Sequence, residues 1–381
     1  MRLKRNYPQL AYRPNRRVLL DALRFGPLLR LAAVVSIAAA VCGALVFAGV
    51  AIRRRAALAQ VDALPAQATA TPEAAATGSA PGPVHAVVLP AGVSLLADAS
   101  IADGALLFAA GEADDRFDQI VRVDAASGDA EAIRAPVEYA SLRNPVESGG
   151  QIAYIDARAS GGGAIMLLDR ASGAARRVCL HAAEIPALYY EAPYLVWQMR
   201  TAEHIEKLVA FNTQAASAVT LTVFGDTAGA LSEPSLKSGL VLYADAGADT
   251  PDAGYIRATQ LLDGSAWESA MDMPVHDPKS FGHTWAWLTG RHGADGDLYY
   301  SENGASPVCA ARGVVDFGIT AGGLVYGKDE TVYLYRLSDG ETVRLSEPGT
   351  RAQLAAVADE LALWRDITDA AQPIWKYRRI G

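Results

Sequence analysis

The chain has 381 residues and a formal net charge of −8 at pH 7. Its first 55 residues hold 11 basic residues and 1 acidic residue, so the remaining residues carry −18. So acidic a domain is repelled by nucleic acid and by anionic membrane surfaces, which excludes nucleic acid as a partner. Three cysteines are too few for a disulfide scaffold.

A long apolar segment follows a basic tail of residues 1–30. Residues 31–52, from Leu31 to Ile52, contain no charged side chain. Twenty-two residues suffice to cross a bilayer core of about 30 Å as a helix. Eight basic residues precede the segment and three arginines follow it directly, which favours a cytoplasmic N-terminus. The sequence therefore predicts a single-pass transmembrane signal anchor in the cell membrane, with the rest of the chain extracellular or periplasmic.

Other interpretations of this segment remain open. A buried core helix is one, although the charged flanks argue against it. A cleaved signal peptide would use the small residues Ala57 and Ala59, which the three arginines separate from the apolar run. Arg16 and Arg17 resemble a twin-arginine export motif, but they lie far from the apolar segment.

Residues 53–83 predict a linker. After the three arginines, residues 56–83 contain 11 alanines and 4 prolines and show no apolar period. Such a composition is typical of an extended or flexible spacer rather than a packed element. We therefore expect this segment to hold the folded part away from the membrane.

An internal repeat begins after the linker and continues to the C-terminus. Its marker is a short apolar strand that ends on an aromatic residue. Successive aromatics are separated by 38 to 46 residues. Seven copies occur, ending on Phe108, Tyr154, Trp197, Tyr243, Trp287, Tyr326 and Trp364. So regular a period predicts an array of similar structural units.

Each copy has room for four strands. A second apolar strand follows the aromatic, then a turn with glycine, such as Gly128, Gly173 or Gly340, and then a third strand. A further strand precedes each aromatic strand. Four strands per copy predict an all-β, seven-bladed β-propeller over residues 84–381. The last copy lacks an outer strand, and we expect residues 84–89 to complete it and close the ring.

The repeat resembles the TolB-like propellers and the N-terminal propeller of dipeptidyl-peptidase-type enzymes. Residues 119–128, Gln-Ile-Val-Arg-Val-Asp-Ala-Ala-Ser-Gly, carry the resemblance most clearly. It implies the propeller fold without the peptidase activity, because the chain has no Gly-x-Ser-x-Gly motif and no hydrolase domain after the propeller. A quinoprotein repeat is the second interpretation of the same turn.

The repeat also indicates whether the two cysteines of the propeller can form a disulfide. Cys179 and Cys309 fall in outer strands of the second and fifth blades. These strands lie nearly opposite each other across the ring, whereas a disulfide needs Cα atoms within about 7 Å. We therefore predict two unpaired thiols.

The loops between the second and third strands of the blades are acidic. They share one face of the disc with the links between blades. If residues 84–89 form an outer strand, the linker from the membrane joins the disc at the opposite face. The face with the acidic loops then points away from the membrane, and we call it the outward face. Oxygen-rich loops suit calcium, although none has the spacing of a calcium loop, and we predict no cofactor and no metal site. The candidate binding residues on this face are Asp114, Asp115, Asp245, Asp249, Asp252, Arg291, His292 and Asp295.

Two further groups of side chains carry weaker signals. His276, His283 and His292 lie in one blade near aspartates, but their spacing places them on different strands and loops, so we interpret them as turn and surface residues. Tyr189, Tyr190 and Phe317 fall on innermost strands, where they would line the channel or pack between blades. We expect packing.

No catalytic set emerges from the sequence. We therefore expect a membrane-anchored extracytoplasmic propeller that acts as a binding or scaffolding module for a protein or glycan partner on its outward face. The alternative is an envelope enzyme, a glycan-cleaving or lactone-cleaving propeller with its site at the channel mouth. A sensor that signals to the basic tail is a third interpretation.

Overall fold

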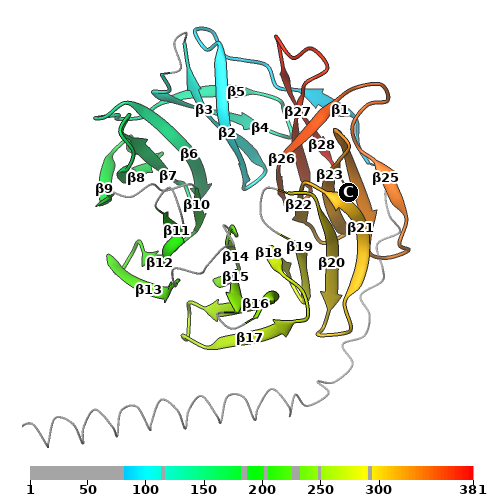
Figure 1. Ribbon diagram of the computed structural model, residues 1–381. Helices are drawn as coiled ribbons and strands as arrows, with labels where there is room; N and C mark the ends of the chain where they lie inside the picture. The colour runs from blue at the N-terminus through cyan, green and yellow to red at the C-terminus, as the bar shows by residue number, and fades with distance from the viewer. Residues whose placement is uncertain are drawn as a thin grey trace, which may run out of the picture. The chain divides into compact units, whose positions relative to one another are not determined.

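The structure, a computed structural model, is a seven-bladed β-propeller (Figure 1). It describes residues 81–112, 116–181, 187–200, 205–224, 232–247, 250–290 and 294–380. Seven four-stranded antiparallel sheets surround a central channel, which confirms the all-β propeller. No helix long and apolar enough to span a membrane occurs in these ranges, and the predicted anchor at residues 31–52 lies outside them.

The first four blades each use four consecutive strands, from the channel to the rim. Blade 1 holds β2 (Leu95–Ala102), β3 (Ala105–Gly111), β4 (Gln119–Asp124) and β5 (Ala130–Arg134). Blade 2 holds β6 (Ser141–Ser148), β7 (Gln151–Ala157), β8 (Gly163–Asp169) and β9 (Ala175–His181). Blade 3 holds β10 (Leu188–Glu191), β11 (Tyr194–Arg200), β12 (Ile205–Asn212) and β13 (Ser217–Val223). Blade 4 holds β14 (Ser235–Lys237), β15 (Leu240–Gly247), β16 (Thr250–Gln260) and β17 (Ala266–Met271).

The last three blades continue the pattern, except that blade 7 takes a strand from the other end of the chain. Blade 5 holds β18 (Val275–Phe281), β19 (Thr284–Thr289), β20 (Gly296–Glu302) and β21 (Val308–Val314). Blade 6 holds β22 (Asp316–Ile319), β23 (Gly323–Lys328), β24 (Thr331–Arg336) and β25 (Thr342–Arg344). Blade 7 holds β26 (Ala352–Ala358), β27 (Leu361–Asp366), β28 (Ile374–Arg379) and β1 (Val84–Ala86).

The repeated aromatics form the core between blades. All seven lie in second strands and are nearly inaccessible; Phe108 and Tyr154 are fully buried. A second strand is covered by its own neighbours and by the adjacent blades, so its side chains are buried on both faces. Burying one such ring contributes roughly 2–3 kcal/mol of hydrophobic free energy. This requirement recurs in every blade, and it produces the period in the sequence.

Tight turns join the first and second strands of each blade. Asp103-Gly104 and Ser238-Gly239 have positive φ at both residues, 48° and 73° in the first turn. Two-residue turns of this kind suit the twist of antiparallel strands and favour Gly, Asn and Asp. These turns all lie on one face of the disc, opposite the outward face. We call it the proximal face.

The ring closes through β1, which occupies the outermost place in blade 7. Val84 pairs with Arg378 and Ala86 with Lys376. Arg378 then donates hydrogen bonds to the carbonyl oxygens of Pro81, Gly82 and Leu345. The first and last strands are thereby fastened together, and the chain enters the propeller on the proximal face.

Neighbouring innermost strands are joined by a repeated contact. Ser100 Oγ in blade 1 donates to the Pro145 carbonyl of blade 2 at 2.6 Å, and Ser235 Oγ in blade 4 donates to the Pro278 carbonyl of blade 5 at 2.8 Å. Between blades 6 and 7 the strands approach so closely that a Cβ on Gly318 would lie 2.2 Å from Val357 Cβ. The channel is therefore walled by seven directly contacting strands.

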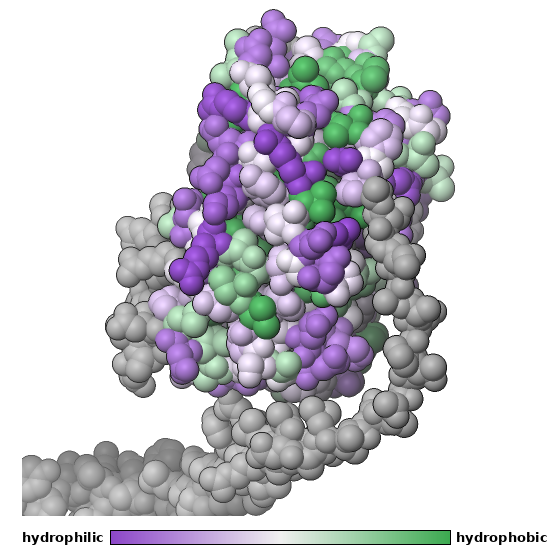
Figure 2. All heavy atoms as spheres, turned by 90° about the vertical axis from the view of Figure 1, so that its right-hand side faces the viewer, coloured by the Kyte–Doolittle hydropathy of each residue, from purple (hydrophilic) through white to green (hydrophobic). Residues whose placement is uncertain are grey.

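The rim carries no large uniform patch on the side shown in Figure 2, which bears β21 and β25: hydrophilic and hydrophobic side chains are interspersed there. Cys179 and Cys309 lie on outer strands β9 and β21 and both are free thiols, as predicted. Burial raises the pKa of the Cys179 thiol to about 11, so this cysteine is a poor nucleophile at neutral pH.

Arg378→Ala should weaken ring closure. The variant removes three charge-assisted hydrogen bonds to backbone carbonyls, and we expect the free energy of unfolding to fall by about 2 kcal/mol. Denaturant unfolding followed by tryptophan fluorescence measures this loss. Arg379→Ala is the matched control, because the Arg379 side chain forms an exposed 3.8 Å ion pair with Glu360, and its loss should change stability by less than about 0.5 kcal/mol. Equal losses in both variants would contradict the fastening role.

Blade 7 should also show a defined acid dependence at Asp366. Burial alone would raise its pKa, but hydrogen bonds from Thr368 and the Lys376 ammonium 2.9 Å away outweigh it and hold the pKa below 3.8. A depressed carboxyl pKa contributes stability that is complete above the unfolded value and is lost as pH falls through the folded value. The melting temperature of wild type should exceed that of Asp366→Asn at pH 7, and the gap should close below about pH 4. A gap independent of pH would contradict this assignment.

Candidate binding site in the central channel

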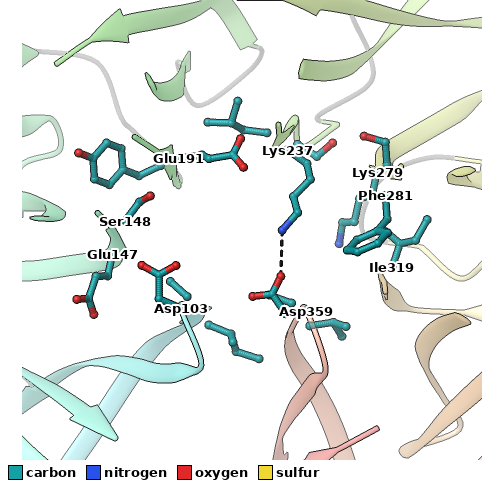
Figure 3. A pocket seen from close by; sticks show the side chains of 17 residues that line it. Asp103, Glu147, Ser148, Glu191, Lys237, Lys279, Phe281, Ile319 and Asp359 are labelled. Atoms are coloured by element: carbon teal, nitrogen blue, oxygen red, sulfur yellow. Dashed lines mark hydrogen bonds and ion pairs between the residues drawn. The ribbon is translucent and has the colours of Figure 1, made fainter. Parts of the chain in front are cut away.

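The channel opens on the proximal face into a cavity of about 230 Å³. Every blade contributes to its wall through the end of its innermost strand or the adjoining turn (Figure 3). Pockets for drug-sized ligands usually measure roughly 300–1,000 Å³. This cavity therefore suits one side chain or one small headgroup rather than a whole folded segment.

Most side chains at the mouth come from one repeated position in the blades. It is the last residue of the first strand, just before the turn, and it pairs with the first residue of the second strand. In register with the start of the second strand stand residues of quite different chemistry: Ala102, Ser148, Glu191, Lys237, Phe281 and Ala358. The neighbouring turns add Asp103 and Asp359. The fold therefore fixes where these side chains stand and leaves their identity free.

An ion pair crosses the mouth from blade 4 to blade 7. Lys237 Nζ lies 3.0 Å from Asp359 Oδ1, and Figure 3 shows the lysine reaching over the cavity to that turn. The same ammonium lies 5.6 Å from the centroid of the Phe281 ring. Both partners are partly solvated, with 38% and 49% of their side chains exposed, so the pair contributes at most about 1 kcal/mol.

Two further carboxylates face the mouth. Asp103 stands at the β2–β3 turn with φ of 48° and is exposed. Glu191 accepts a hydrogen bond from the Gly239 amide at 2.9 Å, which links blade 3 to blade 4. Figure 3 shows Asp103, Glu191 and Asp359 around the same opening as Lys237. The mouth therefore has three carboxylates and one ammonium.

Glu147 belongs to the wall rather than to the opening. Its side chain is only 2% exposed and accepts hydrogen bonds from Arg122 at 2.9 Å and from Arg170 at 2.6 Å. Arg170 also pairs with Glu131. Two guanidinium groups thus neutralise this carboxylate and join blades 1 and 2.

Lys279 lies deeper in the channel and has its own partners. Its ammonium donates to the Phe317 carbonyl, lies 4.8 Å over the Phe317 ring and is 3.6 Å from Asp316. Burial alone would lower its pKa, but Asp316, Asp277 and Glu233 outweigh it and raise the pKa above its usual value. Lys279 therefore stays protonated within the channel.

Tyr189, Tyr190 and Phe317, three aromatics of innermost strands, pack between blades, as expected. Phe317 is buried in the core cluster of blades 5 and 6. Tyr190 borders the cavity and donates to Gln151 Oε1 of blade 2, while Tyr189 donates to Glu233 of blade 4 at 3.1 Å. Burial, with the Glu233 carboxylate, raises the pKa of Tyr189 well above its usual value, so its hydroxyl remains protonated.

The candidate residues of the outward face are described only in part. Asp245 lies in β15, where its carboxylate is 3.1 Å from the guanidinium of Arg257 on β16. Asp295 is exposed before β20. The structure does not describe the side chains of the others, Asp114, Asp115, Asp249, Asp252, Arg291 and His292. Neither Asp245 nor Asp295 lines the cavity.

Within the described ranges, no group of three or more His, Cys, Asp or Glu side chains is arranged to hold a metal ion. His276 is buried, and its Nδ1 lies 2.9 Å from the Asp277 carboxylate, so it belongs to the interior of blade 5 rather than to its surface. The expectation of a turn or surface residue is wrong for His276, because it stands on the innermost strand β18.

The mouth residues were not among the sequence candidates. The sequence does contain a signal for them: the mouth residues stand either just before the turn that precedes an aromatic-ending strand, as Lys237 stands before Ser238-Gly239, or in that turn, as Asp103 and Asp359 do. Their identities do not repeat, so a search for recurring motifs passes over them. Lys237 holds the position before the turn and Asp359 stands in the turn itself, so their pairing follows only from the arrangement of the blades.

Comparison with solved structures places the fold among peptidase propellers. The propeller domain of the trilobed protease from Pyrococcus furiosus matches with a TM-score of 0.56 at 13% identity, over 77% of this chain and 97% of that one. A prolyl endopeptidase matches with a TM-score of 0.55 at 12% identity. The acylaminoacyl peptidase of Pyrococcus horikoshii matches with a TM-score of 0.52 at 14% identity. The expected likeness to peptidase-type propellers is therefore confirmed, for the fold alone.

The matches differ from this chain in extent and closure. The match with the prolyl endopeptidase spans 76% of this chain but only 50% of that enzyme. The match with the acylaminoacyl peptidase spans 71% of this chain and 49% of that enzyme. The trilobed protease propeller has an open velcro topology, whereas here β1 completes blade 7. No family model matches the chain, and no curated protein matches it.

Glu147→Gln should destabilise the wall of the cavity. It leaves Arg122 and Arg170 without their shared carboxylate, and breaking such a buried pair costs about 3 kcal/mol. Thermal unfolding of the full chain would measure the change. Glu138→Gln is the control, because its 3.8 Å pair with Arg177 is exposed on both sides. A Glu147→Gln variant as stable as the control would mean that the arginines find other partners.

Proposed function

We propose that this protein is a membrane-anchored, extracytoplasmic β-propeller that acts as a binding module and holds a protein partner at the proximal mouth of its channel. Residues 31–52 would provide the anchor. The observation that carries the proposal is the cavity of about 230 Å³, on which all seven blades converge with charged, aromatic and aliphatic side chains. Concave sites with a few convergent polar groups are the usual place for recognition.

The mouth supports binding better than the outward face. Asp245 on the outward side is already paired with Arg257, which is in turn paired with Glu268. At the mouth, Asp103 is exposed at a turn tip, and the pair of Asp359 with Lys237 is more open to solvent, with 49% of the Asp359 side chain exposed against 19% for Asp245. Exposed groups on rigid strand ends are positioned in advance, so a partner orders few residues when it binds.

The alternative is an envelope enzyme that cleaves a glycan or a lactone, because carboxylates at the channel mouth are one of its requirements. Two of the four carboxylates that line the cavity are bound within the protein. Glu147 is held by two arginines, and Glu191 accepts a hydrogen bond from the Gly239 amide. Groups committed in this way favour a recognition surface over general acid or base chemistry.

The proposal predicts that a charge reversal at the mouth abolishes partner capture. Full-length protein in detergent would be used to capture proteins from solubilised cell envelopes, with and without calcium. Asp359→Lys places a second cation opposite Lys237, and we expect the recovered partner to decrease at least about tenfold. Asp329→Lys is the matched control, since Asp329 has a similar positive φ but lies in the β23–β24 turn on the outward face.

The outcomes separate the candidates. Loss of one protein partner with Asp359→Lys but not with Asp329→Lys supports the mouth as the binding site. Loss with Asp329→Lys alone would move the site to the outward face. Capture of glycan instead of protein would overturn the class of partner, and release of cleaved glycan or opened lactone would establish the enzyme.

A further inference from the structure

We propose that the mouth of the channel binds a single lysine or arginine side chain of the partner, seated among Asp359, Asp103 and the ring of Phe281 in place of Lys237. The inference rests on the proposed function and names the chemistry that the site recognises. It starts from the cavity, whose volume of about 230 Å³ admits one long side chain.

Lys237 shows how a cation fits this cavity. Its ammonium is 3.0 Å from Asp359 and 5.6 Å from the Phe281 ring centroid, so a carboxylate and an aromatic face contribute to one cation position. Together these two groups are typical of sites that recognise ammonium and guanidinium groups. The chain itself therefore occupies a site that a partner's cation would also fit.

The charges of the mouth leave room for a second cation. Asp103, Glu191 and Asp359 face one ammonium, that of Lys237 (Figure 3). Glu147 and Lys279 do not alter this balance at the opening, because each is neutralised by partners in the wall. A guest cation would thus find carboxylate charge that the resident lysine does not balance.

The wall below the carboxylates is apolar on one side. Leu236, Phe281, Ile319 and Val357 line the cavity and belong to blades 4 to 7. Such a wall suits the methylene stem of lysine or arginine, which covers apolar surface while its charged head stays among polar groups. A bare metal cation or a small hydrophilic ammonium ion would leave this surface uncovered.

Displacement of Lys237 requires little free energy. The pair with Asp359 is half exposed, and exposed pairs of this kind are weak. Lys237 is also on the short strand β14, of three residues, and its long side chain can turn out to solvent once Asp359 accepts another cation. The resident lysine therefore acts as a competitor of the guest.

The experiment is a titration of full-length protein in detergent with two neutral-backbone probes. One is Nα-acetyl-lysine methylamide, and the other is the uncharged Nα-acetyl-norleucine methylamide, with binding followed by NMR line broadening of the probe. Wild type should bind the lysine probe at least about fivefold more tightly than the norleucine probe. Lys237→Met should tighten lysine binding about tenfold, and Asp359→Asn should weaken it about tenfold.

Matched variants keep the result interpretable. Lys328→Met and Asp329→Asn change the same residue types at the opposite end of the disc and should leave probe binding unchanged. Melting temperatures identify any variant that is unfolded. Should Asp359→Asn be unstable, Asp103→Asn replaces it, because Asp103 is exposed at the same opening and asparagine also tolerates its positive φ.

Equal binding of the two probes, or no tightening with Lys237→Met, overturns the inference. If a partner is still captured through the mouth in that case, the proposed function stands and only its chemistry is wrong. If the lysine probe binds as expected but no protein is captured, the cation site stands and the proposed protein partner is wrong.

Discussion

The structure depends on closure of the ring. Each blade buries its second strand against both neighbours, so a ring with one defective blade would expose the core of two others. Blade 7 is the critical place, because its outermost strand comes from the N-terminal end of the propeller. Arg378 joins that strand to blades 6 and 7 through three carbonyl groups. Closure also fixes the face of the disc on which the chain enters.

Closure determines the geometry of the channel in turn. The seven innermost strands contact one another through short links such as Ser100 to Pro145 and through the close approach at Gly318. Their ends must then converge on the proximal face, whatever side chains they carry. The cavity is therefore a consequence of the ring, and its chemistry is a consequence of the residues that happen to stand at the strand ends.

This separation explains what could be predicted from the sequence. Phe108 and Trp364 recur in kind because every blade imposes the same burial, and such repetition is visible without a structure. The residues at the mouth have no shared requirement, so Lys237 and Phe281 hold equivalent positions without resembling each other. Their proximity to Asp359, 122 residues away from Lys237, follows only from the order of the blades around the axis.

The same reasoning explains the place of Asp245, one of the acidic candidates of the outward face. It lies in strand β15, where its carboxylate pairs with Arg257 on β16. Its equivalents two residues after the aromatic, Asp156 and Asp366, also serve the blade: Asp156 accepts from the amides of residues 138 and 139, and Asp366 from Thr368. Carboxylates at that repeated position stabilise connections. Asp359 also has a role in the fold, because its φ of 52° is one that Asp, Asn and Gly tolerate in tight turns, but its carboxylate stands at the opening, where a charge can serve recognition.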